Sequence, residues 1–254
     1  RVMATVGEDF GDYRAWLEDK GVDTTLMKVV PGIFTASFFA TTDHASAQIA
    51  SFYPGAMGYS ATQSLKELDK KPDLVIVSPS SPDAMMKFPA EARELGIPYL
   101  YDPSQQVLRL EGQELARDME GAYFLFCNDY EFGLISKKTG WSLDQILEHV
   151  KVLVITRGKD GADLYSDGDS VHIPTVPEDE VVDPTGVGDA FRGGFLAGYS
   201  HGFDWKLCGE IGSLSAVYCL EQRGTQNHSY TRQDFVQRFR KHFNDGGKLD
   251  VLLK

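Results

Sequence analysis

Four short, continuously apolar runs alternate along the chain with segments of helical periodicity, and this alternation constrains the fold more than any other feature. The runs are residues 74–77, 98–101, 123–126 and 152–155. A strand without a polar face is typical of a parallel sheet that helices cover on both sides. The alternation therefore predicts an α/β fold with a mostly parallel central sheet.

A fifth core strand is predicted at residues 2–6, and helices are predicted where apolar residues recur every three to four positions. Two helices begin at clear caps, because Ser81 precedes Pro82 and Ser142 lies three residues before Gln145. The predicted helices are residues 13–20, 62–69, 82–95, 130–137, 142–149, 189–201, 204–221 and 231–243. No linker or repeat interrupts these elements, so residues 1–254 are predicted to form a single domain.

One segment departs from the alternation. Residues 33–40 and 47–53 have strand-like patterns and flank residues 41–44, so a hairpin is predicted over residues 32–53. Such an insertion is either a lid that covers a substrate or an ordinary edge hairpin. The pattern alone does not separate these two interpretations.

The charge balance is acidic, with 37 Asp and Glu against 25 Lys and Arg, for a net charge of -12. An acidic surface argues against binding to nucleic acid or to anionic membranes. The apolar runs are too short to cross a bilayer, and the first residues do not resemble a signal peptide.

Three cysteines (Cys127, Cys208 and Cys219) form no CxxC pair, so core thiols in a reducing cytoplasm are expected.

The most informative segment is residues 182–195, where a glycine-containing loop leads into a predicted helix. The free N–H groups at a helix start and the positive end of its dipole form an anion site, and glycines let a phosphate approach the backbone. Asp189 lies where this site opens. It is either a base that takes the proton of an attacking alcohol or a helix cap.

Residues 183–194 resemble the C-terminal signature of the ribokinase (PfkB) family, whose DTxGAGD-type loop forms an anion hole and ends in the catalytic Asp. This chain differs in having Pro184 and Val187. The resemblance implies a ribokinase-like three-layer sandwich with a small β lid, and an ATP-dependent kinase. It implies catalytic roles for Asp189 and for the loop residues Gly186, Val187 and Gly188.

Three further segments follow the family's order. Asn128 and Glu131 match an NxxE element that organises Mg²⁺ in the family, although an Asn cap with an acidic first turn has the same pattern. Residues 152–162 resemble a strand that ends in T-x-G-x-x-G, and a tight strand–turn–strand is the alternative. By resemblance, this segment assigns ATP binding to Thr156, Gly158 and Gly161, with Arg157 as a phosphate contact.

Residues 216–226 resemble, more loosely, the helix and turn that flank the adenine, which assigns Gly224 to the nucleotide. In some members, the positions of Asp183 and Thr185 help to bind a monovalent cation such as K⁺. Family members often dimerise through the lid, so a homodimer is a further expectation.

The chain looks closest to the bacterial and archaeal nucleoside kinases, including adenosine kinase-like members. Phe34 and Phe52 are predicted to stack on a nucleobase, with Asp102 as another substrate contact, although each Phe also suits the lid core. Sugar kinases of the ribokinase or fructokinase type are the alternative, and a non-catalytic nucleotide binder is another. The family's opening strand with its Asp and GGxxxN segment has no match, because residues 1–9 resemble a later strand that ends in a G-x-D turn. We therefore expect an N-terminal portion to be missing.

Overall fold

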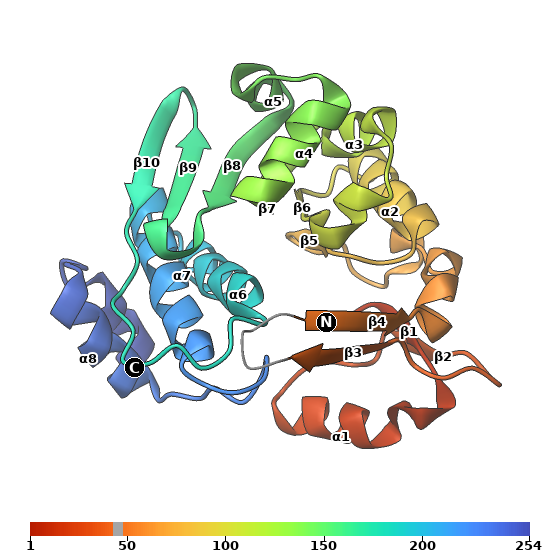
Figure 1. The fold of residues 1–254 in the computed structure, drawn as a ribbon, viewed down its shortest axis with the longest axis horizontal. Coiled ribbons are helices and arrows are strands. Elements are labelled where there is room, and N and C mark those ends of the chain that lie inside the picture. Colours follow the sequence, from red (N-terminus) through yellow and green to blue (C-terminus); the bar gives the residue numbers. More distant parts are fainter. Residues whose placement is uncertain (43–47) are drawn as a thin grey trace. The chain divides into compact units, whose positions relative to one another are not determined.

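The computed structural model describes residues 1–42 and 48–254, and Figure 1 shows its elements. The chain divides into two compact units, each described here by itself. The first unit contains Arg1–Tyr123 and Lys137–Gly140, and the second contains Phe124–Ser136 and Trp141–Lys254. The one-domain prediction for residues 1–254 stays a prediction.

The central sheet has six strands in the order β10-β9-β8-β7-β6-β5. β5 and β6 pair in parallel, whereas β8, β9 and β10 form antiparallel pairs. All four apolar runs lie in this sheet, and the predicted α/β class with a mostly parallel central sheet is confirmed. The strands are β5 (Val75–Val77), β6 (Tyr99–Tyr101), β7 (Ala122–Asn128), β8 (Val150–Thr156), β9 (Ala162–Ser166) and β10 (Asp169–Ile173).

The strand at the start of the chain was assigned to the wrong sheet. β1 (Ala4–Val6) pairs in parallel with β2 (Met27–Val29), which was not predicted, in a separate two-stranded sheet. Val6 packs with Phe10 and Leu17 of the following turn and of α1 (Gly11–Asp19). This small cluster gives β1 a core of its own in the first unit.

No α-helix forms at residues 62–69, so this prediction is wrong. The structure instead has two 3₁₀ helices, η2 (Gly55–Thr62) and η3 (Leu65–Glu67). Ser64 is extended, its hydroxyl accepts from Lys66 N at 3.1 Å, and a Glu91 oxygen accepts from Leu65 N at 2.7 Å. These side-chain acceptors compete with the backbone ladder that an α-helix needs.

The described part of the first unit also contains the α-helices α2 and α3, and part of α4, which is described below. α2 (Pro82–Glu94) was predicted and packs against β5, β6 and α3. α3 (Gly112–Met119) was not predicted. Its cap is Glu111, which forms a reciprocal capping box with Glu114. Glu is outside the residue types that usually signal a helix start, so no clear cap could be recognised there from the residues alone.

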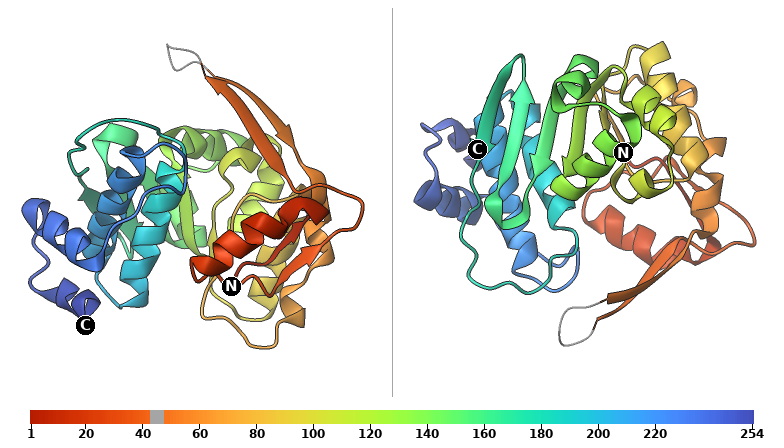
Figure 2. Two further views of the ribbon diagram at one scale, coloured as in Figure 1. Left: turned by 90° about the horizontal axis from the view of Figure 1, so that it is seen from below. Right: turned by 45° about the horizontal axis from the view of Figure 1, so that its top comes forward.

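The predicted hairpin is present as β3 (Ser37–Thr42) and β4 (Gln48–Tyr53), which pair antiparallel. Figure 2 shows them as a two-stranded ribbon that projects from the rest of the first unit. Of the turn predicted at residues 41–44, positions 43 and 44 lie outside the described residues. We call β3 and β4 the lid strands.

The second unit holds the helices predicted after the β7 strand, within one or two residues of their predicted bounds. α7 packs against β9, β10, α6 and α8, and α5 packs against β8. Within the described ranges 1–42 and 48–254, no helix is both long and apolar enough to cross a membrane. The helices are α4 (Asp129–Thr139, whose last residues belong to the first unit), α5 (Leu143–His149), α6 (Val187–Ser200), α7 (Trp205–Leu220) and α8 (Arg232–His242).

Candidate active site

The N-terminus of α6 presents open backbone amides. Its cap is Gly186, which is left-handed at φ 83° and ψ 0°. The first intrahelical hydrogen bond runs from Ala190 N to Gly186 O at 2.9 Å. The amides of Gly188 and Asp189 therefore precede the helical ladder and lie at the positive end of the helix dipole, while Val187 N donates to Pro184 O at 3.4 Å. This arrangement favours an anion.

Two glycines of this loop differ in what the protein requires of them. A Cβ on Gly186 would lie 2.9 Å from Thr225 Cβ, and its φ is also unfavourable for a side chain. A Cβ on Gly188 would meet nothing within 4 Å, and its backbone is not left-handed. Gly186 is thus needed for the fold, whereas Gly188 leaves space in front of the helix start.

Asp189 extends into solvent from the first turn of α6, with 76% of its side chain exposed. It is not the helix cap, since that position belongs to Gly186. Arg192 Nη2 donates to Asp189 Oδ1 and forms an ion pair with it. The role of Arg192 was not predicted, although three-residue spacing on a helix places such pairs side by side.

Asp183 ties the loop to the turn near Gly224. Its Oδ1 accepts from Thr185 N at 2.9 Å, and its Oδ2 accepts from Gly224 N at 3.0 Å. These hydrogen bonds, the one from the Thr185 backbone first, lower the pKa of Asp183. The structure therefore brings together three predicted site residues that are up to 41 positions apart in the sequence.

Aromatic packing fixes α6 against β7. The Phe126 ring lies 5.1 Å from the Phe195 ring and 6.5 Å from the Phe191 ring, measured between centroids. Phe126 lies two residues before Asn128, and Phe191 lies two residues after Asp189. The packing thus holds the C-terminal end of β7 near the start of α6.

Asn128 and Glu131 cap α4 reciprocally. Glu131 N donates to Asn128 Oδ1 at 2.7 Å, and Asn128 N donates to Glu131 Oε2 at 2.8 Å. This is the geometry of the cap interpretation, and it leaves the second oxygen of Glu131 outside the box. Across the part of the chain that the structure describes, no three His, Cys, Asp or Glu side chains gather as a metal cage.

The T-x-G-x-x-G segment forms a tight connection between β8 and β9, as the alternative interpretation expected. Gly158 and Gly161 have φ values of 55° and 84°, and a Cβ on Gly161 would lie 2.1 Å from Ile173 O. Arg157 Nε donates to Asp163 Oδ2 at 2.6 Å, and Asp163 Oδ1 lies 2.8 Å from His172 Nδ1. Asp163, which the sequence did not single out, therefore orients the Arg157 guanidinium.

The predicted substrate residues belong to the first unit. Phe34 is 64% exposed, and Phe52 lies opposite Phe38 on the lid strands and is 45% exposed. Asp102 is fully buried directly after β6, and its N–H donates to Val77 O at 3.0 Å. Asp183, Gly186, Val187, Gly188, Asp189 and the predicted ATP contacts belong to the second unit.

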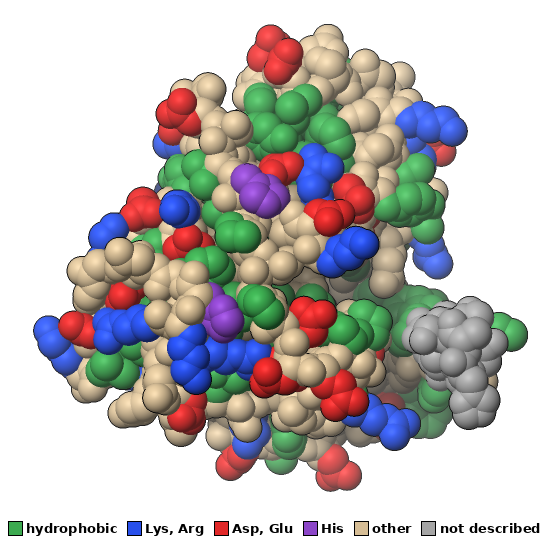
Figure 3. Space-filling model, turned by 60° about the vertical axis from the view of Figure 1, so that its left-hand side comes forward, with side chains coloured by type: hydrophobic (Ala, Val, Ile, Leu, Met, Phe, Trp, Pro, Cys, Tyr) green, Lys and Arg blue, Asp and Glu red, His purple; other side chains and the backbone are tan. Residues whose placement is uncertain are grey.

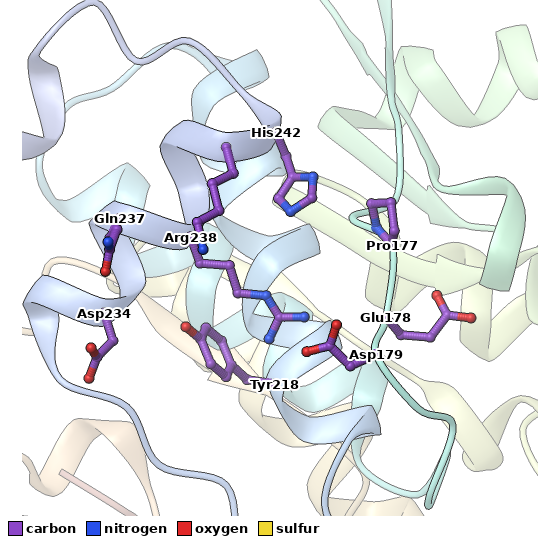
Figure 4. A pocket seen from close by; sticks show the side chains of 9 residues that line it. Pro177, Glu178, Asp179, Tyr218, Asp234, Gln237, Arg238 and His242 are labelled. Atoms are coloured by element: carbon purple, nitrogen blue, oxygen red, sulfur yellow. The ribbon is translucent and has the colours of Figure 1, made fainter.

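A pocket of about 390 Å³ lies between residues 177–179 and α8 (Figure 4). None of the predicted site residues lines it. Arg238 in its wall forms two hydrogen bonds to Glu221, at 2.7 and 2.6 Å, and lies 4.8 Å above the centre of the Tyr218 ring. Its guanidinium therefore links α7 to α8.

On the face shown in Figure 3, acidic and basic side chains are interspersed among the described residues.

Comparison with known proteins identifies the family. The family model described as pfkB family carbohydrate kinase matches residues 1–232. A nucleoside kinase of Methanothermobacter thermautotrophicus is 33% identical over 242 residues, which covers 94% of this chain and 78% of that protein. A nucleoside kinase of Methanocaldococcus jannaschii is 29% identical over 246 residues, which covers 95% and 80%.

The solved structures agree with this. The structure of Burkholderia thailandensis nucleoside kinase in complex with inosine has a TM-score of 0.91 and 37% identity, and the match covers 96% of this chain and 79% of that one. The same kinase has also been solved in complex with ADP-inosine, again with a TM-score of 0.91. Because the family model matches residues 1–232 of the chain, the chain belongs to the pfkB family of carbohydrate kinases, as the loop at residues 183–194 predicted.

Proposed function

We propose that the chain is an ATP-dependent kinase that transfers the γ-phosphate of ATP to a hydroxymethyl group of a nucleoside. The observation that carries this proposal is the start of α6, where open amides and the unobstructed Gly188 stand beside the exposed Asp189 carboxylate. The nucleoside kinases that match most of the chain support the choice of substrate.

Asp189 acts as the base in this mechanism. It accepts the proton of the substrate hydroxyl, whose oxygen forms a bond to the γ-phosphorus while the bond from that phosphorus to the β-phosphate oxygen breaks, releasing ADP. Arg192 engages Oδ1 of Asp189, so the proton goes to Oδ2. The amides of Gly186, Val187 and Gly188 receive the charge on the transferring group.

The nucleotide is bound by the second unit. Thr156, Gly158 and Gly161 contact ATP, and Arg157, oriented by Asp163, contacts its phosphates. Asp183 supports this arrangement because it holds the turn at Gly224, assigned to the adenine side, against the loop assigned to the phosphates.

Asn128 and Glu131 would hold Mg²⁺ through water, since their reciprocal cap uses the single side-chain oxygen of Asn128 and one of the two oxygens of Glu131. When bound, Mg²⁺ neutralises phosphate charge. A monovalent cation such as K⁺ would find oxygen donors at Asp183 and Thr185, and the lowered pKa of Asp183 keeps that carboxylate charged.

Phe34 and Phe52 contact the nucleoside, whereas Asp102, the other predicted contact, is fully buried directly after β6 and offers no exposed surface to a ligand. The exposed rings offer apolar faces to a purine or pyrimidine, which a free sugar lacks. Pairing of two copies through the lid stays a prediction.

The variant Asp189→Asn tests the mechanism because it keeps the shape of the side chain and removes the base. We expect ATP affinity, measured by calorimetry, to remain within about threefold, while ADP production with inosine falls by about 10²-fold or more. Asp144→Asn is the matched control, since Asp144 is an exposed carboxylate in the first turn of α5. Turnover by Asp189→Asn at the control's rate would exclude Asp189 as the base.

A further inference from the structure

The backbone of residues 33–35, which leads into the lid, is enclosed by two glycines. Gly7 follows β1, and a Cβ there would lie 2.3 Å from Thr35 N. Gly55 follows β4, and a Cβ there would lie 2.2 Å from Phe34 O. Both glycines are needed for this close approach, and Gly55 also has a positive φ of 43°. The base of the lid is therefore in tight contact on both sides.

Hydrogen bonds fix Phe34 and Thr35. Asp9 Oδ1 accepts from Thr35 N at 2.8 Å and from the Thr35 hydroxyl at 2.7 Å. That hydroxyl accepts in turn from Gly7 N at 2.9 Å. On the other side, Ala56 N donates to Phe34 O at 2.9 Å. We call Gly7, Asp9, Thr35 and Gly55 the lid clamp.

The lid clamp holds the backbone of Phe34, yet the Phe34 ring is 64% exposed. A large apolar ring held out from a fixed backbone loses little further freedom when it binds, which favours affinity. Phe52 differs because it lies within the lid strand β4, beyond the clamp.

We propose that Asp9 and Gly7 are positioning residues for the nucleoside: they fix the backbone at the base of the lid so that the Phe34 ring is presented to the nucleobase. This rests on the proposed function, which assigns Phe34 to the nucleoside. Both residues come from the G-x-D turn that the sequence singled out but that the kinase mechanism leaves without a role.

Kinetics of Asp9 variants test the proposal. Asp9→Ala removes the acceptor of both Thr35 bonds, so we expect the KM for inosine to rise about tenfold while the KM for ATP changes less than about twofold. Asp9→Asn keeps Oδ1, which accepts both bonds, so it is expected to restore the KM for inosine. Asp12→Asn, an exposed carboxylate in the adjoining turn, is the control.

Three results would overturn the positioning role. The first is an equal rise in Asp9→Ala of the KM for inosine and the KM for ATP, and the second is no change in either value. The third is an Asp9→Asn variant as impaired as Asp9→Ala, because this result would indicate that the charge of Asp9 matters and not its hydrogen bonds. If Asp9→Ala does not fold, Thr35→Val provides a partial comparison, since it removes the hydroxyl that links Gly7 to Asp9 and keeps the bond from Thr35 N to Asp9.

Hydrogen exchange separates this proposal from the kinase assignment, because it needs no turnover. In Asp9→Ala we expect faster exchange at the amides of Thr35 and Ala56 than in the unsubstituted protein, with the amides of α2 unchanged. Unchanged exchange at Thr35 would overturn the clamp even if the protein phosphorylates nucleosides. A protein that shows the exchange effect but phosphorylates no nucleoside would contradict the proposed function and leave the clamp as a structural feature only.

Discussion

At the scale of single residues, the loop at residues 183–188, here called the anion loop, shows that two glycines can be required for different reasons. The fold requires glycine at position 186, because φ is 83° there and a Cβ would lie 2.9 Å from Thr225 Cβ. Gly188 has no such constraint, because a Cβ there would meet open space. We therefore attribute Gly188 to the space that a transferring phosphoryl group needs, and not to the conformation of the loop.

The variant Gly188→Ala separates fold from function. Ala is favoured over Gly in a helix, so we expect the free energy of unfolding in urea to stay equal or rise by up to about 1 kcal/mol. The added methyl group narrows the approach to the amides, so kcat for ATP-dependent phosphorylation is expected to fall by about tenfold or more. Gly133→Ala in α4 is the control, because a Cβ there also meets nothing within 4 Å. Equal activities of the two variants would argue against a phosphoryl group at Gly188.

The site could be predicted only as far as sequence motifs reach. The order of Pro, Gly and Asp residues at positions 183–194 makes a long and specific motif. The comparisons confirm the family that this motif indicated. Arg192 and Asp163 were missed because each acts through a side-chain contact, with Asp189 and Arg157 respectively, that no motif contains. The double role of Asp183 depends on Gly224, which only the folded chain brings near.

At the scale of elements, strands that form a continuous apolar run were predictable, and the antiparallel strands β9 and β10 were not. β7 and β8 are almost continuously buried, so their apolar runs stand out. β9 alternates between buried and half-buried residues, and β10 is mostly exposed, so neither forms an apolar run. The helix predicted at residues 62–69 failed for another reason, since Ser64 and Glu91 bind backbone amides that an α-helix would use.

The link between α7 and α8 gives a prediction at this scale. Glu221 and Arg238 are 12% and 16% exposed and share two hydrogen bonds. Glu221→Gln weakens them, so we expect a loss of about 1 to 3 kcal/mol in the free energy of unfolding at pH 7. Glu178→Gln is the control, because Glu178 is an exposed carboxylate that lines the same pocket as Arg238. A loss no larger than the control's would show that the pair does not hold the two helices together.

The same pair has a defined pH dependence. The hydrogen bond from Arg238 lowers the pKa of Glu221 below its ordinary value of 4.5. Because the folded-state pKa is lowered, the stabilisation is complete above the unfolded-state pKa and is lost as the pH falls through the folded-state value. The difference between Glu221→Gln and the unsubstituted protein, followed by urea unfolding, should therefore shrink below pH 4.5.

At the scale of the whole molecule, the proposed chemistry is divided between the two units. The second unit contains the anion loop and the predicted ATP contacts, and the first contains the lid strands and the clamp at their base. This division predicts separate kinetic effects. Substitutions at Asp183 or Arg157 are expected to change the KM for ATP, and substitutions at Asp9 the KM for the nucleoside.

The measurement that tests the central claim most directly is ATP-to-ADP conversion with Mg²⁺ across adenosine, inosine, guanosine, cytidine, ribose and fructose. We predict turnover with one or more nucleosides and little or none with the two free sugars. Turnover on ribose or fructose alone would contradict the nucleoside assignment while keeping Asp189 as the base. Silence on all six acceptors, with ATP still bound, would contradict the kinase itself.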